Sequence, residues 1–226
     1  MTVSIIIPVL NEEKEIEKFL KQFRKFRKQS EIILVDGGSK DKTIEIASRF
    51  DYVTIISSRR GRARQMNAGA KAANGDVLIF LHADTYLPIN AIEAVKKVVV
   101  NGSDYGCFGV KINSRRLSLI IASKLINIRT KITHVASGDQ TIFVRRELFE
   151  EVGGYADIPL MEDLELTRRL KEIGDFVELS LRVSTSSRRW EEWGVYKTIL
   201  TMWSLRTLYY IGVSPEKLAE FYRNVR

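Results

Sequence analysis

Short apolar runs alternate with amphipathic segments along the first half of the chain. Four such runs, each bounded by polar or glycine residues, suit buried strands at residues 5–9, 31–36, 53–56 and 77–81. Between them, apolar residues recur every three or four positions, which is typical of helices, here at residues 16–26, 44–47 and 63–73. This alternation predicts an α/β fold with a mostly parallel sheet that is covered by helices on both faces.

The second half of the chain continues without an obvious boundary. We expect strands at residues 106–112 and 141–144, and helices at residues 90–100, 117–132, 147–152, 164–173 and 195–211. No internal repeat, low-complexity tract or Pro/Gly-rich linker divides the chain, and 226 residues suffice for one sizeable core. We therefore expect one catalytic domain over residues 1–194, with residues 195–226 as a helical extension of the same domain.

Basic residues outnumber acidic residues by 36 to 28, so the net charge is +8. A basic surface attracts anions such as nucleotides, nucleic acid or acidic lipid headgroups. The densest basic stretch, residues 59–64, has no interleaved aromatic rings to stack on bases, so nucleic acid lacks support. The single Cys107 cannot form an internal disulfide, and the N-terminus does not resemble a signal peptide. These features favour a cytoplasmic protein, and no apolar run is long enough to predict a membrane-spanning helix.

Two potential metal ligands follow the buried run at residues 77–81. The period of two along a strand directs His82 and Asp84 to the same side at its carboxyl end, where open α/β sheets bind their ligands. A carboxylate there can hold Mg²⁺ or Mn²⁺, and such a cation can hold a diphosphate. The alternative is structural, with Asp84 beginning a turn and His82 buried and hydrogen-bonded.

Polar residues also follow the neighbouring strands. Asp36 ends the second strand, where its carboxylate could bind ribose hydroxyls or a base N–H, or cap the next helix. The segment Pro8-Val9-Leu10-Asn11-Glu12 ends the first strand and would line the same crevice, unless it is a simple turn. Arg62 and Gln65 open a helix and could face phosphate or base, although a solvated basic loop is the alternative. Glycine-rich dinucleotide and P-loop motifs are missing from the sequence, so carboxylates, cations and a metal would hold the nucleotide.

Two further polar elements could act on a second substrate. If Asp84 and a metal hold an activated donor, an acceptor hydroxyl must lose its proton as it attacks that donor. Glu162 and Asp163 begin a helix, where they either complement the helix dipole or supply a general base. Asp139 and Gln140 lie in a polar stretch between apolar segments, suited to hydrogen-bonding an acceptor or to forming a plain turn. The sequence thus offers several candidate groups for moving the proton of an acceptor hydroxyl.

The C-terminal region combines cations with aromatic rings. Arg189 could neutralise a leaving diphosphate while Trp190 stacks on a sugar. Alternatively, both residues could serve as an anchor on the protein surface. The helix at residues 195–211 has an apolar face with aromatic residues, which would suit peripheral contact with anionic lipid at the inner face of a membrane. Packing of this helix against the sheet, or against a second subunit in a homodimer, is the alternative.

Taken together, these motifs resemble glycosyltransferase family 2 with the Rossmann-like GT-A fold. Four motifs occur in the family's order and approximate spacing and cover nearly the whole chain: Ile5-Ile6-Ile7-Pro8-Val9-Leu10-Asn11-Glu12, Val35-Asp36-Gly37-Gly38-Ser39, Phe80-Leu81-His82-Ala83-Asp84 and Met161-Glu162-Asp163-Leu164-Glu165-Leu166. More narrowly, residues 60–69, 138–140 and 187–191 resemble a subgroup of small stand-alone members associated with arsenosugar biosynthesis.

The resemblance implies an inverting hexosyltransferase that moves a sugar from a nucleoside-diphosphate sugar to an acceptor hydroxyl in a single displacement. It implies the following roles: the nucleoside is bound by Pro8, Asn11, Glu12 and Asp36, the metal on the diphosphate is held by Asp84, and the general base is Asp163. The family's Asp-x-Asp motif is His82-Ala83-Asp84 here, and an imidazole ligand would suit Mn²⁺ better than Mg²⁺. Ser186 replaces the glutamine of the Gln-x-x-Arg-Trp motif of processive members, so polymer synthesis is not expected.

Two other functions are alternatives. A sugar-nucleotide pyrophosphorylase would also bind nucleotide and Mg²⁺ on a parallel sheet, but Pro8-Val9-Leu10-Asn11 does not resemble the glycine-rich, basic loop of that class. A non-catalytic basic scaffold at a membrane or nucleic acid would not need the three carboxylates Asp36, Asp84 and Asp163 at separate sheet-edge positions. Glycosyl transfer therefore fits the sequence better than either alternative.

Overall fold

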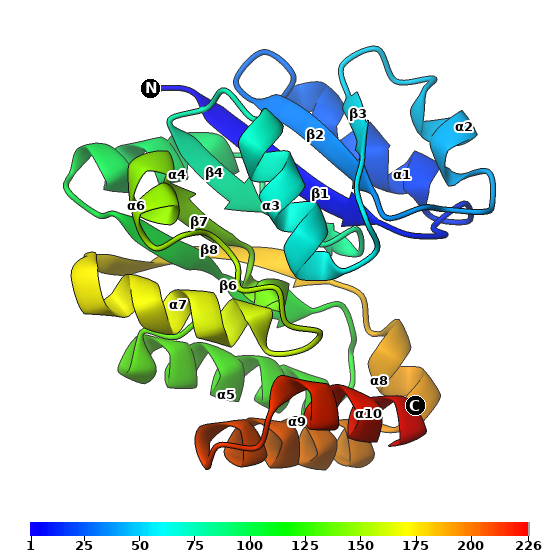
Figure 1. The fold of residues 1–226 in the computed structure, drawn as a ribbon, viewed down its shortest axis with the longest axis vertical. Coiled ribbons are helices and arrows are strands. Elements are labelled where there is room, and N and C mark those ends of the chain that lie inside the picture. The colour runs from blue at the N-terminus through cyan, green and yellow to red at the C-terminus, as the bar shows by residue number, and fades with distance from the viewer. Residues whose placement is uncertain (226) are drawn as a thin grey trace.

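The structure, a computed structural model, describes residues 1–225 without the side chains of Arg189, Glu192, Asn224 and Val225, and is built on one eight-stranded sheet (Figure 1). The strands are β1 Val3–Val9, β2 Glu31–Asp36, β3 Thr54–Ser57, β4 Val77–Phe80, β5 Thr85–Tyr86, β6 Tyr105–Ile112, β7 Ile142–Arg145 and β8 Phe176–Thr185. The helices are α1 Ile16–Lys21, α2 Thr43–Ala47, α3 Arg62–Ala72, α4 Ala91–Val100, α5 Leu117–Thr133, α6 Arg146–Glu151, α7 Glu162–Ile173, α8 Arg188–Trp193, α9 Val195–Tyr210 and α10 Pro215–Val225. Two short 3₁₀ helices, η1 Gln22–Lys25 and η2 Gly138–Gln140, complete the description.

The strands follow the order β3-β2-β1-β4-β7-β6-β8-β5. Strands β3, β2, β1 and β4 run parallel, as the alternating pattern predicts. β7 then runs antiparallel to both β4 and β6, and β6 runs parallel to β8. The expected α/β fold with a mostly parallel sheet and helices on both faces is confirmed.

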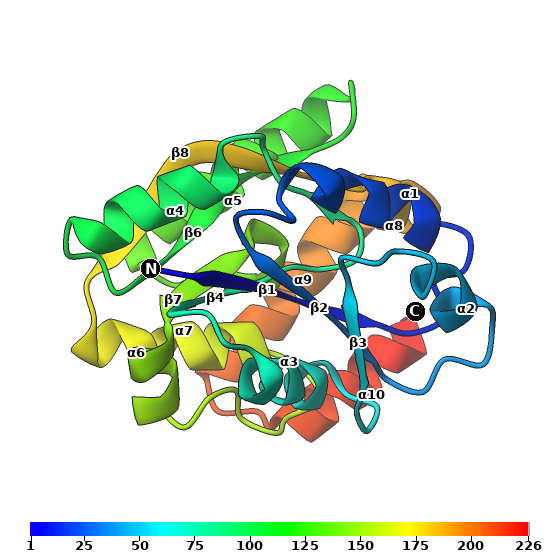
Figure 2. The same cartoon turned by 90° about the horizontal axis from the view of Figure 1, so that it is seen from above.

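Alternate residues of the strands enter separate cores on the two faces of the sheet. Ile5 and Ile7 of β1 pack with α1 and α4 on one face, whereas Ile6 packs with α3 on the other. Figure 2 shows α1 and α4 on one side of the strands and α3 and α6 on the opposite side. On the α3 face, a Cβ on Gly69 would lie 2.3 Å from Ile6 Cγ2, so only glycine lets the helix approach β1 this closely.

Several elements differ from the expected ones. The expected helix at residues 16–26 is divided into α1 and η1. Strand β8 was not expected, although Leu179-Ser180-Leu181-Arg182-Val183 alternates apolar and polar residues; its pairing with β6 shifts register after Phe108. The C-terminal helices α8 and α10 were also not expected.

Helix α9 has two apolar faces. One face packs through Leu205 onto α10 and onto Leu164 of α7, as an ordinary core helix does. The other face leaves Tyr196, Leu200 and Trp203 exposed. No helix in the described part of the chain combines the length and the apolar character needed to cross a membrane.

Candidate functional site

The carboxyl ends of β1 and β2 meet at a network around Asp36. The Asp36 carboxylate accepts hydrogen bonds from the Ser39 hydroxyl at 2.6 Å and the Ser39 N–H at 3.0 Å. Ser39 Oγ accepts a bond from the Asn11 N–H at 3.0 Å, and Asn11 Oδ1 accepts one from the Lys40 N–H at 2.8 Å. Asn11 has a positive φ of 54°, a conformation that asparagine tolerates better than most residues. The two strand ends are therefore held together by the residues expected to bind a nucleoside.

Gln65 joins the same two strands from α3. Its side chain is buried, and its Nε2 donates to the Val9 carbonyl at 2.9 Å and to the Val35 carbonyl at 2.8 Å. Both amide N–H groups are thereby used by the backbone, whereas the sequence suggested contact with phosphate or base. Gln65 lies beside Gly37, where a Cβ would come within 2.9 Å of Oε1. Its described contacts stabilise the floor of the site.

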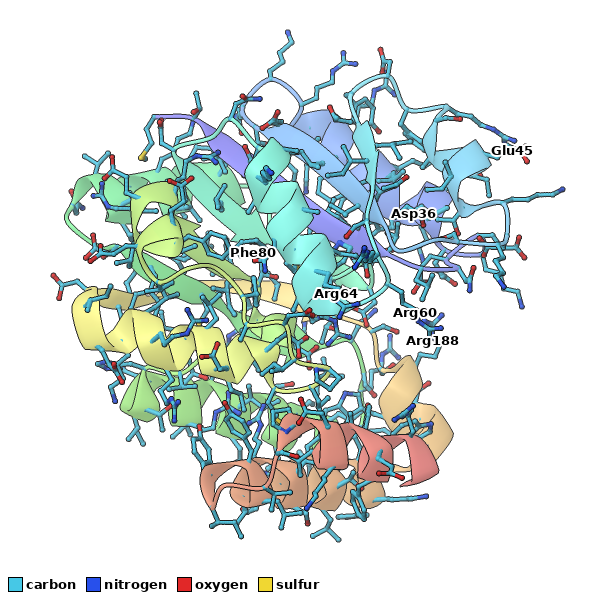
Figure 3. The ribbon with its side chains drawn as sticks, viewed as in Figure 1. Asp36, Glu45, Arg60, Arg64, Phe80 and Arg188 are labelled. Atoms are coloured by element: carbon cyan, nitrogen blue, oxygen red, sulfur yellow. The ribbon has the colours of Figure 1, made fainter. Side chains whose placement is uncertain are left out.

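Asp84 follows β4 and is near enough to Glu12, which follows β1, to affect its ionisation. Burial raises the pKa of Glu12 above its usual value, Arg188 opposes this rise, and the Asp84 carboxylate adds to it. Asp84 Oδ1 also accepts a hydrogen bond from the Thr85 hydroxyl at 3.1 Å. Figure 3 shows Arg188 at α8 on the side of the molecule where Asp36 ends β2. Two carboxylates that repel each other at a strand end are a suitable environment for a cation.

A divalent metal fits Asp84 better than it fits His82. His82 Nδ1 lies 3.5 Å from Asp139 Oδ1, so its ring is directed to Asp139. Within the described residues, no three His, Cys, Asp or Glu side chains form a metal-binding group. Mg²⁺ commonly takes only one or two protein carboxylates together with substrate phosphates and water. The donor set therefore suits an ion shared between Asp84 and a diphosphate.

Asp163 begins α7 and is held by two backbone N–H groups. Its Oδ2 accepts from Gly138 at 2.6 Å, and its Oδ1 accepts from Leu164 at 2.8 Å. Burial, and then the neighbouring Glu162 carboxylate, raise the pKa of Asp163; these two N–H groups and Arg62 oppose the rise. A fixed, half-buried carboxylate with a raised pKa has the properties of a general base.

Arg62, at the start of α3, lies beside Glu162 and Asp163. Its Nη1 is 3.2 Å from Glu162 Oε1, and the Glu162 side chain is 4% exposed whereas that of Arg62 is 48% exposed. Desolvation lowers the pKa of Arg62. The carboxylates of Glu162, Asp163 and Asp139 raise it by more than this, so the net shift is upward. Arg62 thus remains a permanent cation beside three carboxylates.

His82, Gly138 and Asp139 lie together beside Asp163. A Cβ on Gly138 would lie 2.5 Å from Cε1 and Nε2 of His82 and 3.5 Å from Asp163 Oδ2. Only a residue without a side chain allows the His82 ring and the Asp163 carboxylate to approach the backbone here. Although 80 residues separate them along the chain, His82 and Asp163 are parts of one cluster.

Helix α3 also ties down the segment that leads to Asp163. Asn67 Nδ2 donates to the Tyr155 carbonyl at 2.8 Å, and the Tyr155 N–H donates to Asn67 Oδ1 at 2.9 Å. Arg64 Nε contacts both carboxylate oxygens of Asp157, at 2.7 and 2.9 Å. With the Arg62–Glu162 pair, the first two turns of α3 hold the segment at residues 154–162.

Two of the expected acceptor or leaving-group residues, Gln140 and Trp190, have other surroundings. Gln140 is fully buried, and its Oε1 accepts from the Thr130 hydroxyl at 2.8 Å, so it fixes the η2 turn. Trp190 packs in the apolar cluster between α5 and α9. The side chain of Arg189 lies outside the described residues.

Arg129 of α5 was missed by the sequence reasoning. Burial lowers its pKa, and the carboxylates of Asp163 and Asp139 act against this effect. Its Nη2 donates to Gln140 Oε1 at 3.2 Å. No feature of the sequence distinguishes Arg129 from the other basic residues of the same helix, Lys124 and Lys131.

Comparison with known proteins connects this geometry to one family. The family described as Glycosyl transferase family 2 matches residues 4–153, more than half of the chain. The chain is 27% identical over 246 aligned positions to "Probable glycosyltransferase YdaM" of Bacillus subtilis (strain 168), covering 98% of this chain and 58% of that protein. It is 33% identical over 157 positions to "Undecaprenyl-phosphate 4-deoxy-4-formamido-L-arabinose transferase" of Photorhabdus laumondii, covering 63% of this chain and 48% of the relative. The chain thus spans about half the length of these relatives.

Solved structures share the fold. Staphylococcus aureus TarS (residues 1–349) in complex with UDP-GlcNAc is similar with a TM-score of 0.67 at 21% identity, covering 82% of this chain and 58% of that one. The mannosyltransferase PcManGT from Pyrobaculum calidifontis, in complex with GDP-Man and Mn²⁺, is similar with a TM-score of 0.65 at 21% identity, covering 80% and 56%. At this identity the likeness concerns the fold alone. Together with the match over residues 4–153, it leads to one conclusion: the chain belongs to glycosyl transferase family 2.

Proposed function

We propose that this chain transfers a hexose from a nucleoside-diphosphate sugar to an acceptor hydroxyl, with inversion at the anomeric carbon. The observation that carries the proposal is the Asp163 carboxylate, which two backbone N–H groups hold beside Arg62, His82 and Asp139. Family membership and relatives named as glycosyltransferases favour this activity over a pyrophosphorylase or a scaffold. Neighbours in complex with UDP-GlcNAc and GDP-Man support the donor class.

The proposed reaction is a single displacement. The acceptor oxygen attacks the anomeric carbon, the bond from that carbon to the donor phosphate oxygen breaks, and Asp163 takes the hydroxyl proton. The products are the glycoside and the nucleoside diphosphate. Because Asp163 needs its lone pair for this step, the raised pKa makes it a better proton acceptor than an exposed aspartate.

The donor would lie over the carboxyl ends of β1, β2 and β4. Pro8, Asn11, Glu12 and Asp36 would contact the nucleoside, and the exposed Arg188 would add positive charge near the diphosphate. A divalent cation held by Asp84 would neutralise the diphosphate as it leaves, and the Mn²⁺ complex of PcManGT supports this metal use. His82 would orient Asp139 rather than bind the ion.

The proposal also covers the organisation of the chain. Residues 195–226 would be an extension of the catalytic domain, because Leu205 of α9 shares a core with Leu164 of α7. The motifs at residues 60–69, 138–140 and 187–191 support the small stand-alone subgroup associated with arsenosugar biosynthesis. The lone, buried Cys107 supports a cytoplasmic location.

Calorimetry and turnover of one variant test the proposal. Wild-type protein is titrated with UDP, GDP, CMP and dTDP with and without Mn²⁺. In a second assay, the rate at which the matching sugar donor is hydrolysed is measured from the nucleotide that is released. Asp163→Asn should lower this rate by about two to four orders of magnitude, the usual range for a lost general base, and leave nucleotide affinity largely intact. Glu172→Gln, an exposed change on the same helix, is the matched control.

Two results would contradict the proposal. If Asp163→Asn turns over donor near the wild-type rate, Asp163 is not the base, and Glu162 or Asp139 becomes the candidate. If no nucleotide binds to the folded protein with either metal, the donor class is wrong. Since asparagine can accept only one of the two backbone hydrogen bonds, thermal unfolding must show that the variant is folded at the assay temperature.

A further inference from the structure

Two neighbouring helices carry rows of exposed apolar side chains. On α5 the exposed residues recur every three or four positions, and they are Leu117, Ile120, Ile121, Leu125, Ile128 and Ile132. On α9 they are Tyr196, Leu200, Trp203 and Tyr210, with Ile211 just beyond the helix. Monomeric proteins rarely leave apolar residues gathered in this way unless they contact something.

The two helices lie side by side. Leu119 and Ala122 of α5 share an apolar cluster with Val195 and Ile199 of α9, so the buried sides of both helices meet. Figure 1 shows α5 and α9 at one end of the molecule, below the sheet in this view. We call the exposed residues of these two helices the α5–α9 surface.

The two chain segments that carry this surface contain basic residues and no acidic ones. Residues 105–138 contain six lysines and arginines and no aspartate or glutamate, and residues 193–215 contain two and none. These eight charges equal the net charge of +8 of the whole chain, so the remainder of the chain is neutral overall. A cationic apolar surface attracts anionic partners and opposes close approach of a second, equally charged copy.

We propose that the α5–α9 surface docks on an anionic lipid bilayer. The apolar rows would enter the boundary between headgroups and acyl chains, and Trp203, Tyr196 and Tyr210 are of the residue types enriched at that depth. Lys124 and Lys131 are exposed on α5, where they can reach lipid phosphates while their stems cover apolar surface. The sequence suggested α9 alone; the structure adds the longer row of α5.

Docking would place the bilayer against the exposed side of α9, and the buried side of the same helix packs against the start of α7, where Asp163 lies. Leu164, the residue after Asp163, packs with Leu205 of α9 and with Val135, just after α5. This inference rests on the proposed function and makes it more specific. The acceptor hydroxyl would belong to a molecule held in the membrane. Docking itself does not depend on catalysis, so the two ideas can fail separately.

Vesicle co-sedimentation tests the docking. Full-length protein is mixed with vesicles of phosphatidylcholine alone or with phosphatidylglycerol, at low and high salt. We expect binding to the anionic vesicles that decreases with salt. Ile132→Glu combined with Leu200→Glu should weaken it by about tenfold or more, because charge replaces two apolar contacts.

Matched controls separate docking from general effects. Ile89→Glu with Val100→Glu changes residues that are 73% and 74% exposed, comparable with 74% for Ile132 and 66% for Leu200, and should bind as the unmodified protein does. Lys124→Glu with Lys131→Glu should weaken binding to anionic vesicles, whereas Lys18→Glu with Lys97→Glu, on α1 and α4, should not. Asp163→Asn should bind vesicles normally even though transfer is lost.

Three results would overturn the proposal. The protein remains in the supernatant with every vesicle; or binding is equal with and without phosphatidylglycerol; or both glutamate pairs weaken binding equally. If analytical ultracentrifugation instead detects a dimer that Ile132→Glu with Leu200→Glu dissociates, and no vesicle binding occurs, the surface is an interface between copies.

Discussion

Replacement of Gln65 by leucine distinguishes a structural role from a role in nucleotide binding. In the structure, both N–H groups of the Gln65 amide are donated to backbone carbonyls, those of Val9 and Val35. Leucine has a similar size but no donor, so Gln65→Leu removes both hydrogen bonds between α3 and the strand ends. The consequences for stability and for ligand binding can be measured independently.

The size of the effect follows from what remains around each carbonyl. The Val9 carbonyl also accepts from the Gly37 N–H at 3.0 Å, so it keeps one partner when the bond from Gln65 is removed. Removal of that bond should cost about 0.5–1.5 kcal/mol, the value of one hydrogen bond. If the buried Val35 carbonyl is left without a hydrogen-bond donor, the cost is about 1–3 kcal/mol. The free energy of unfolding should therefore decrease by about 1.5–4.5 kcal/mol, which lowers Tm by roughly 3–18 °C in a chain of this size.

Urea unfolding, followed by circular dichroism, measures this loss as a shift in the midpoint at constant slope. Gln29→Leu is the control, since the exposed side chain of Gln29 has Glu93 as its one described hydrogen-bond partner. The free energy of unfolding of this variant should change by less than about 0.5 kcal/mol. Calorimetry with the preferred nucleotide, at a temperature where both variants are folded, gives the second readout. Unchanged stability of Gln65→Leu together with lost nucleotide binding would refute the structural role and restore the one the sequence suggested.

Three further changes probe the site. Asp84→Ala should abolish metal-dependent nucleotide binding measured by calorimetry, whereas His82→Ala should weaken it less; metal-independent binding that survives in Asp84→Ala would exclude a metal there. The transfer rate should rise with pH through a pKa above the usual aspartate range, and Arg62→Ala should shift this limb to higher pH, because Arg62 lowers the pKa of Asp163. The same shift means that the Asp163 contribution to stability is present below its unfolded pKa and is lost as pH rises through its folded pKa. Gly138→Ala should destabilise the protein by about 1–3 kcal/mol and reduce transfer more than nucleotide affinity, since the new Cβ would collide with His82; wild-type kinetics in this variant would contradict the close approach.

Local pattern was sufficient to predict the parallel half of the sheet. Strands β1, β2 and β4 are continuous apolar runs, and such runs identify buried strands without knowledge of their neighbours. The antiparallel insertion of β7 between β4 and β6 was not predicted, because it depends on pairing between segments far apart in sequence. Strand β8 was not predicted, although residues 179–183 alternate between apolar and polar side chains.

The candidate site was partly predictable for a similar reason. Asp36 and Asp84 follow recognisable strands, so their position at the carboxyl edge follows from the strand assignment. Whether Gln65 faces a ligand or the backbone depends on how closely α3 approaches β1, which no local pattern encodes. The structural role of Gly138 was not predicted from the sequence, because it depends on the His82 ring that packs against it.

The attachment of residues 154–162 to α3 makes these two segments one module for protein engineering. Tyr155, Asp157 and Glu162 each have their partner on α3, at Asn67, Arg64 and Arg62. A graft of this segment from a relative would leave three unmatched partners on the host helix unless α3 were exchanged with it. Chimeras intended to alter the surroundings of Asp163 should therefore take both segments from the same parent, although more than 80 residues separate them in sequence.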